Sequence, residues 1–149
     1  RLLFKDEVRQ LGDVLGMPAE LTRRQPFPEP GLALRIVGEV TREKLGMVRQ
    51  ADAIFREEVV AAGLDRRIWQ YFAVLTDIRT LGPRNGRVCE EYAVALRAVS
   101  SHDVLSFNAY RLPYDLLERV CQRVTAEVPG VNRVLYDVTG MPTAFIEWE

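Results

Sequence analysis

The chain has 149 residues, 48% of them hydrophobic and 28% charged, a balance that predicts one globular domain with a core of ordinary size. Its 20 basic and 21 acidic residues leave a formal net charge of −1, which provides no overall field to attract nucleic acid or an anionic membrane. No apolar run approaches the roughly 20 residues that a membrane span requires, and no signal peptide is recognisable.

The first element is predicted to be an amphipathic helix of about three turns, because Phe4, Val8, Leu11 and Leu15 fall at helical spacing before Gly16. The chain starts inside this helical pattern without a Met, so we expect it to be a piece of a longer protein. Prolines then predict a stiff, backbone-exposed loop, because they cannot donate ladder hydrogen bonds and they hold the preceding residues extended. This loop spans residues 25–31.

The next elements are predicted to be a strand, a long helix and a second strand. Apolar residues alternate over 32–37, which indicates a strand that ends near Gly38. Thr41 can cap a helix with one apolar stripe that ends at Gly63. Residues 68–75 are apolar on both faces apart from Gln70, which predicts a central strand covered on each side.

The second half of the chain is predicted to contain a loop over 82–91, a strand over 92–99, a helix opened by Pro113 and two terminal strands joined by a Gly-Met-Pro turn. The whole pattern predicts a single α/β domain of the α+β type. Its antiparallel or mixed sheet would be packed by two long helices and preceded by the N-terminal helix and the Pro-rich loop. Cys89, Cys121 and His102 lack the spacing of zinc ligands, so we expect no metal site and two reduced cytosolic thiols.

Several segments, in this order and spacing, carry a family resemblance: FKDEVRQLG, RQPFPEPGLALRIVGEV, ADAIFREE, RIWQYFAVL, VALRAV, LPYDLLERV, GVNRVLYDVTG and the closing IEWE. The chain resembles, over essentially all 149 residues, the C-terminal dimerisation domain of GMP synthase, the glutamine-hydrolysing ligase. That family aminates xanthosine monophosphate (XMP) to GMP with ATP. The resemblance implies that residues 1–149 form the dimerisation and XMP-binding domain.

The resemblance also implies what this chain lacks. An amidotransferase domain that releases ammonia and an ATP pyrophosphatase domain that adenylates XMP would lie upstream, and the Ser-Gly-Gly-x-Asp-Ser phosphate loop of the second is absent here. ATP and magnesium are therefore implied for the parent enzyme and no cofactor for this part, which would contribute no catalytic residue. We expect a cytoplasmic homodimer that contacts the upstream domain and binds neither nucleic acid nor a membrane.

Three residues match substrate-binding positions of the family. Arg24 matches the arginine that binds the XMP phosphate, Gln70 a glutamine that contacts the nucleotide, and Glu147 a carboxylate placed against it. A guanidinium suits a phosphate because it is permanently charged and presents a planar fork of donors. The alternatives are a solvated arginine, a core glutamine bonded to the sheet and an exposed strand glutamate. Trp148 is interpreted as a core or interface residue.

The chain departs from the family where the family binds substrate. Met141 stands at the position of a phosphate-binding lysine, and a thioether cannot replace an ammonium as a charge partner. The loop over 85–90 loses the family's Asp, Arg and Tyr at the matching positions, and Glu29 replaces a glycine of the Pro-rich loop. We therefore consider three functions: part of an active GMP synthase, a divergent paralogue with a different nucleotide-like ligand or no catalysis, and a plain homodimerisation module.

Overall fold

The computed structural model describes residues 3–22, 31–101 and 106–148. Its regular elements are α1 (Lys5–Val14), α2 (Ala19–Thr22), the 3-10 helix η1 (Leu32–Arg35), α3 (Arg42–Ala61), β1 (Gln70–Arg84), β2 (Arg87–Ser100), β3 (Asn108–Ala109), α4 (Tyr114–Glu127) and β4 (Val131–Asp137). The α+β class, the two long helices and the N-terminal helix are confirmed. The Pro-rich loop lies almost wholly outside the described residues. Within the described ranges, no helix is both long enough and apolar enough to cross a membrane.

The sheet is mixed, and β2 is its central strand. β1 pairs antiparallel with one edge of β2, while β4 (parallel) and the short β3 (antiparallel) share the other edge. The prediction that residues 68–75 form the central strand is therefore wrong. The strand does occur, and residues 70–76 are buried on both faces as expected, but along the outer edge of β1 the described residues contribute only a single bridge from Ile36.

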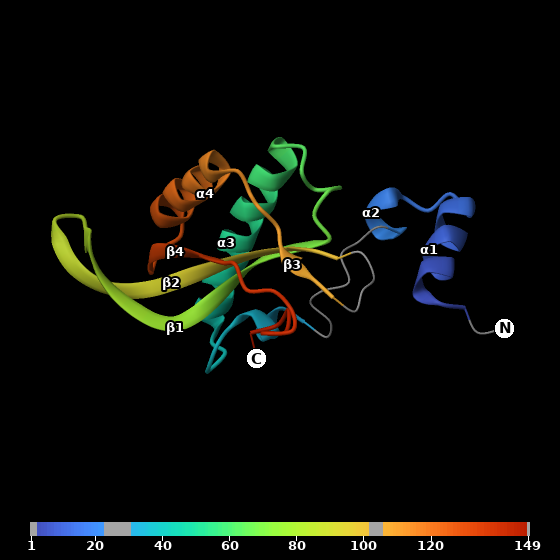
Figure 1. Ribbon diagram of the computed structural model, residues 1–149. Coiled ribbons are helices and arrows are strands. Elements are labelled where there is room, and N and C mark those ends of the chain that lie inside the picture. Colours follow the sequence, from blue (N-terminus) through green and yellow to red (C-terminus); the bar gives the residue numbers. More distant parts are fainter. Residues whose placement is uncertain (1–2, 23–30, 102–105, 149) are drawn as a thin grey trace.

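One face of the sheet carries the main core, and α3 and α4 cover it (Figure 1). Side chains alternate along β1, so Tyr71, Ala73 and Leu75 pack against the two helices, while Phe72 and Val74 point the other way. We call that second side the far face of the sheet. A smaller cluster forms there, where Phe72, Val74 and Ala95 are covered by the half-buried side chains Leu34, Val37 and Ile146.

The two long helices follow the sequence prediction closely. Thr41 caps α3 by accepting a hydrogen bond from the Lys44 N–H, and Pro113 precedes the first turn of α4. Most of the predicted apolar stripe of α3 is buried, as are three of the residues expected to face inward from α4: Leu116, Val120 and Val124.

The predicted strand over 32–37 is wrong. The backbone turns as the 3-10 helix η1, and only Ile36 pairs with β1, at Leu75. In an extended strand Arg35 would lie on the opposite face from Leu34 and Ile36, but here its side chain is buried and bonds to Asp52 of α3 at 2.7 Å. A buried guanidinium needs an acceptor, so the chain turns here to bring Arg35 onto α3 instead of extending along the sheet edge.

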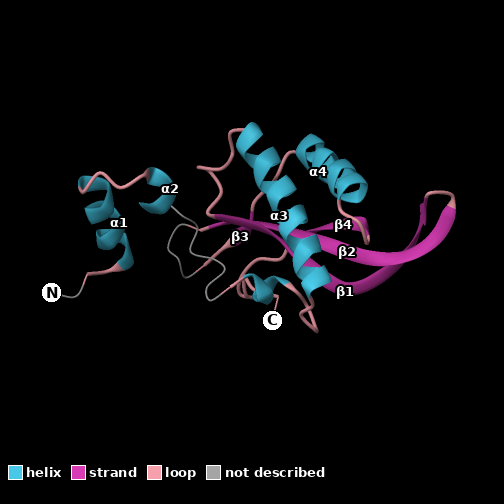
Figure 2. Cartoon of the chain, turned by 180° about the vertical axis from the view of Figure 1, so that it is seen from behind, coloured by secondary structure: helices cyan, strands magenta, loops and turns pink. Residues whose placement is uncertain are grey.

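The predicted loop over 82–91 is also wrong. β1 and β2 run through it as a long curved hairpin that extends beyond the helices (Figure 2). Its tip is the pair Asn85 and Gly86, whose φ angles of 53° and 76° are those of a two-residue hairpin turn. An Asn-Gly pair favours this turn because both residues tolerate positive φ, so the turn residues here marked a hairpin and not a loop.

Two glycine substitutions should shift stability in opposite directions. Gly86→Ala places a Cβ at φ 76° and is expected to destabilise the chain by about 1 kcal/mol. Gly46→Ala in α3 should stabilise it by about 0.5–1 kcal/mol, because an added Cβ meets nothing within 4 Å and the helix loses a flexible residue. Urea unfolding of both variants measures the changes, and equal signs would contradict this assignment of the turn.

The second predicted terminal strand does not form. β4 ends at Asp137, and residues 138–148 run as an irregular segment beneath the far face of the sheet. The alternation of Ala144 and Ile146 was interpreted as strand pairing, but Ile146 packs against Phe72, Val74 and Ala95. The apolar pattern therefore reflects burial against a sheet face, which periodicity alone does not distinguish from pairing at an edge.

The N-terminal helices lie apart from the sheet in both views (Figures 1 and 2). α1 forms where the sequence predicts it, and Gly12 of α1 lies against Thr22 at the end of α2. Its apolar stripe stays exposed, with Phe4, Val8 and Leu11 all open to solvent within the described part of the chain.

Candidate functional site

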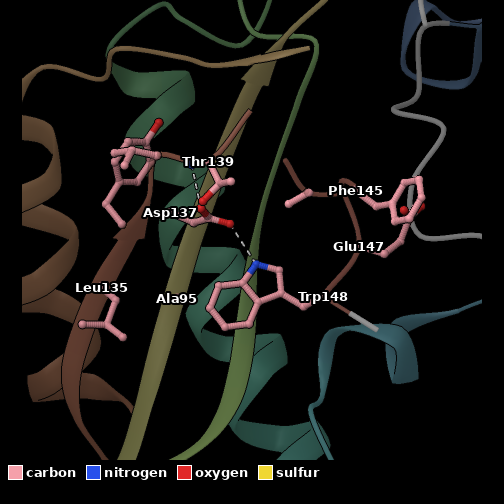
Figure 3. A pocket seen from close by; sticks show the side chains of 10 residues that line it. Ala95, Leu135, Asp137, Thr139, Phe145, Glu147 and Trp148 are labelled. Carbon is pink, nitrogen blue, oxygen red and sulfur yellow. Dashed lines mark hydrogen bonds between the residues drawn. The ribbon is translucent and has the colours of Figure 1, made fainter. Parts of the chain in front are cut away.

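A cleft of about 630 Å³ lies on the far face of the sheet, between the strands and the irregular segment that follows β4. We call residues 138–148 the C-terminal segment. Ala95 of β2 and Leu135 of β4 are register partners and contribute to the strand side of the cleft (Figure 3). Most of the remaining lining comes from the C-terminal segment: Val138, Thr139, Ala144, Phe145, Glu147 and Trp148.

An ion pair between a buried arginine and a part-buried aspartate of the cleft lining lies at this site. Arg97 of β2 and Asp137 of β4 are opposite each other in the parallel register, and their side chains are hydrogen-bonded. The second terminal nitrogen of Arg97 donates to the Phe145 carbonyl oxygen at 3.0 Å. Arg97 is fully buried, so the pair links the interior of the sheet to the wall of the cleft.

Asp137 accepts further hydrogen bonds from the C-terminal segment. Its two carboxylate oxygens receive the Thr139 backbone N–H at 2.8 Å and the Trp148 indole N–H at 3.0 Å. Burial alone would raise the pKa of this carboxyl, but the bonds from Thr139, the charge of Arg97 and the bond from Trp148 together hold the pKa of Asp137 below its usual value.

The depressed pKa of Asp137 predicts how the C-terminal segment responds to acid. A carboxyl whose pKa is lower in the folded state than in the unfolded state stabilises the fold at pH values above its unfolded pKa, which is about 3.9 for Asp. That stabilisation is lost as the pH falls from the unfolded pKa through the folded pKa. Emission of Trp148, recorded in a Trp69→Phe background, should therefore stay constant from neutral pH to about pH 4 and change only below it. A Glu147→Gln variant is the matched control and should keep the same transition. A transition centred near pH 6 would contradict the prediction.

The three residues predicted from the sequence do not all line this cleft. Glu147 lines it and is exposed, on the opposite side from Asp137 (Figure 3). Gln70 is only 4% exposed and lies on the far face with Phe72, outside the lining of the cleft, and its amide oxygen has no hydrogen-bond partner among the described residues. Arg24 lies outside the described residues, as does Glu29.

Two other predictions fall near this site. Trp148 lies in the wall of the cleft and is 36% exposed. Its indole points towards Asp137 (Figure 3). Met141, at the position of the family lysine, is exposed, and its backbone N–H donates to the Phe107 carbonyl oxygen. Across the described ranges, no three His, Cys, Asp or Glu side chains are grouped so that they could hold a metal ion.

Sequence reasoning missed the roles of Arg97 and Asp137. The available signal was an arginine inside an otherwise apolar strand, together with an aspartate at the end of the strand over 131–137. Neither identifies the other as its partner, because the register between β2 and β4 brings them together across 40 residues of chain.

Comparison with known proteins shows which family the chain belongs to. The sequence model described as the GMP synthase C terminal domain matches residues 57–148, which is more than half of the chain. The chain belongs to the GMP synthase C-terminal domain family. The matched region begins inside α3 and includes all four strands, α4 and the cleft.

Several curated relatives of this GMP synthase C-terminal domain carry the name "GMP synthase [glutamine-hydrolyzing]". The protein from Geobacillus kaustophilus (strain HTA426) is 58% identical over 147 residues, covering 99% of this chain and 29% of the relative. The proteins from Caldicellulosiruptor saccharolyticus and Parafrankia sp. are each 56% identical and cover all of this chain, with 29% and 28% of the relatives matched. The chain thus spans less than a third of the length of these relatives.

Proposed function

We propose that this chain is the C-terminal part of a GMP synthase and supplies homodimer contacts and part of the XMP-binding site. The parent protein would aminate XMP to GMP with ATP and magnesium in the cytoplasm. The observation that carries the proposal is the cleft lined by Glu147 on the far face of the sheet, in a chain more than 50% identical to proteins named GMP synthase.

Three groups of this chain would recognise the nucleotide. The Glu147 carboxylate is exposed and able to accept hydrogen bonds from ribose hydroxyls or purine N–H groups. The amide oxygen of Gln70, which has no partner among the residues that the structure describes, is a further acceptor, and burial without a partner costs roughly 1–3 kcal/mol that a ligand N–H would recover. Arg24 would bind the phosphate, by its match to the family arginine.

No group of this chain would make or break a bond. An upstream ATP pyrophosphatase domain would adenylate XMP, and an amidotransferase domain would supply the ammonia that displaces the adenylate. The contribution of this domain is orientation: holding the nucleotide at several points presents its purine to the upstream domain in one pose, which lowers the entropic part of the barrier.

The homodimer is supported by exposed apolar side chains on the long hairpin. Leu81 and Val88, from its two strands, are 69% and 75% exposed, and the strand register places both close to the turn at Asn85 and Gly86. A two-fold contact through such a patch would be isologous, with the same residues on both partners. Sedimentation at micromolar concentration should give a dimer, and a monomer alone would count against it.

Met141 favours a second candidate function. Without the family lysine, one cationic contact to a phosphate is missing, which favours a paralogue that binds a nucleotide-like ligand lacking this phosphate or that only dimerises. This alternative retains the dimer and removes XMP binding, so the two functions are separable by titration.

XMP titration of the full-length protein that carries this chain tests the proposal. Arg24→Ala should weaken XMP binding by about 10–100-fold, as expected for losing a charge-assisted contact worth roughly 1.5–3 kcal/mol. Arg66→Ala, at an exposed arginine after α3, is the matched control and should leave the affinity unchanged. Met141→Lys should tighten binding.

The outcomes separate the candidates. Absence of XMP binding in the unmodified protein, with binding restored by Met141→Lys, would favour the paralogue with a different ligand. Binding that is insensitive to Arg24→Ala would contradict the phosphate role of Arg24.

A further inference from the structure

The C-terminal segment makes most of the cleft but has little apolar anchoring of its own. It contains no helix or strand, and Phe145 is 72% exposed. Among its described side chains, only Ile146 packs into the apolar cluster of the far face, where it is half-buried. Burial of one side chain is a small driving force for ordering eleven residues, so polar contacts must hold the segment in place.

Those polar contacts converge on Arg97. Its guanidinium donates to the Asp137 carboxylate with one terminal nitrogen and to the Phe145 carbonyl oxygen with the other. The same guanidinium lies over the Phe107 ring, 5.3 Å from its centroid, and the Phe107 carbonyl oxygen accepts the Met141 N–H at 3.0 Å. One buried side chain therefore contacts the segment directly and also supports the residue that binds its beginning.

Asp137 extends this attachment to the other end of the segment. It accepts from the Thr139 N–H near the start and from the Trp148 indole at the end. Glu147 lies between Phe145, whose carbonyl oxygen accepts from Arg97, and Trp148, whose indole N–H donates to Asp137. The chain is therefore hydrogen-bonded to the same ion pair on both sides of Glu147. The position of the Glu147 backbone in the cleft follows from these contacts.

We propose that Arg97 is a positioning residue, which acts with Asp137 to hold the C-terminal segment against the far face of the sheet and so places Glu147 in the cleft. The consequence for nucleotide binding rests on the proposed function; the attachment of the segment does not. An arginine suits this role because its planar fork reaches two acceptors in different directions, whereas a lysine ammonium is a single point of charge.

The test must separate positioning from a general loss of stability. Arg97→Met alone leaves the part-buried Asp137 carboxylate without its cation and is expected to destabilise the fold. The double variant Arg97→Met/Asp137→Leu removes both charges and should recover most of the melting temperature, because apolar replacements of a buried pair are well tolerated. Arg133→Met, at an exposed arginine of β4, is the matched control.

Amide hydrogen exchange on the full chain measures whether the C-terminal segment stays in place. The informative amides are those of Met141 and Ala144, whose acceptors Phe107 and Gly140 are unchanged in all variants. In the double variant their protection should fall by about tenfold or more while the amides of α3 keep theirs, a pattern of local opening. Trp148 emission in a Trp69→Phe background should shift to the red. Arg97→Lys should give an intermediate loss.

Unchanged protection at Met141 and Ala144, with native Trp148 emission in the double variant, would overturn the proposal. A uniform loss of protection in α3 and the segment would also overturn it, since Arg97 would then be a general stability residue. The control Arg133→Met should match the unmodified chain in every reading.

A separate measurement of XMP affinity tests whether the attachment of the segment by Arg97 affects binding through Glu147. If the unmodified full-length protein binds XMP, the double variant should bind about tenfold or more weakly, and Glu147→Gln should add little to that loss, because both changes act through one contact. Additive losses would refute the link. If the unmodified protein does not bind XMP, the proposed function fails, while the exchange result still decides the role of Arg97.

Discussion

Replacing Asp52 with alanine is expected to lower the free energy of unfolding by roughly 3–5 kcal/mol, because it leaves a buried cation without its carboxylate. Asp52 accepts from Arg35 and from the Arg56 Nε, each at 2.7 Å, and from the Ala73 backbone N–H at 3.0 Å. These contacts join η1, α3 and β1 at one carboxylate. For a chain of this size the loss corresponds to a fall in melting temperature on the order of 10 °C.

The effect should be large because Arg35 cannot reach solvent. Its side chain is only 1% exposed, and burial lowers the pKa of its guanidinium against the opposing influence of Asp52. Thermal unfolding followed by circular dichroism measures the change. Asp65→Ala, at an exposed aspartate, is the matched control and should stay within about 0.5 kcal/mol of the unmodified chain.

A rescue variant tests the physical cause. Arg35→Met/Asp52→Leu removes both charges and should be more stable than Asp52→Ala, since the penalty arises mainly from keeping the Arg35 charge buried after the Asp52 carboxylate is lost. If Asp52→Ala melts within a few degrees of the unmodified chain, the assigned role of this buried network is wrong.

Phe55→Ala should cost about 3–5 kcal/mol by leaving a cavity between α3 and the sheet. The Phe55 ring is fully buried and meets Tyr71 edge to face, with centroids 5.8 Å apart and an interplanar angle of 83°. Phe55→Ala removes this ring contact together with the apolar burial of the side chain. The cavity persists because close-packed neighbours relax only in part. Denaturant unfolding gives the free energy, with the slope m reporting whether the unfolding remains two-state.

Phe145→Ala is the matched control for Phe55→Ala. The same atoms are removed, but Phe145 lies on the exposed wall of the cleft, so stability should change by no more than about 0.5 kcal/mol. A similar loss in both variants would mean that the core does not lie between α3 and the sheet as described.

Local patterns in the sequence were enough to predict the long helices. The apolar stripe of α3 and the proline that opens α4 act within a few residues, and helix hydrogen bonds are themselves local, so the helices and their buried faces follow from neighbouring residues. The same holds for β1 and β2 as strands, although the Asn85 and Gly86 turn was interpreted as part of a loop. Its residue types do favour a hairpin, so this error was avoidable.

The resemblance to the GMP synthase C-terminal domain was also available from the sequence, and the family match confirms it. It named Glu147 as a substrate-binding residue; Glu147 lines the cleft, and its role in binding stays a prediction. The presence of Gln70 on the same sheet face, but outside the cleft lining, became visible only once β1 was placed on β2.

The tertiary structure decided how segments distant in sequence meet, and there local patterns fail. Residues 32–37 and the end of the chain were both predicted to be strands, yet Arg35 is buried on α3 and Ile146 packs against a face of the sheet. Arg97 and Asp137 form their pair because β4 joins β2 in parallel at one particular register. Periodicity reports which side chains are buried, whereas the partner that buries them depends on strand register and on charge pairing across the fold.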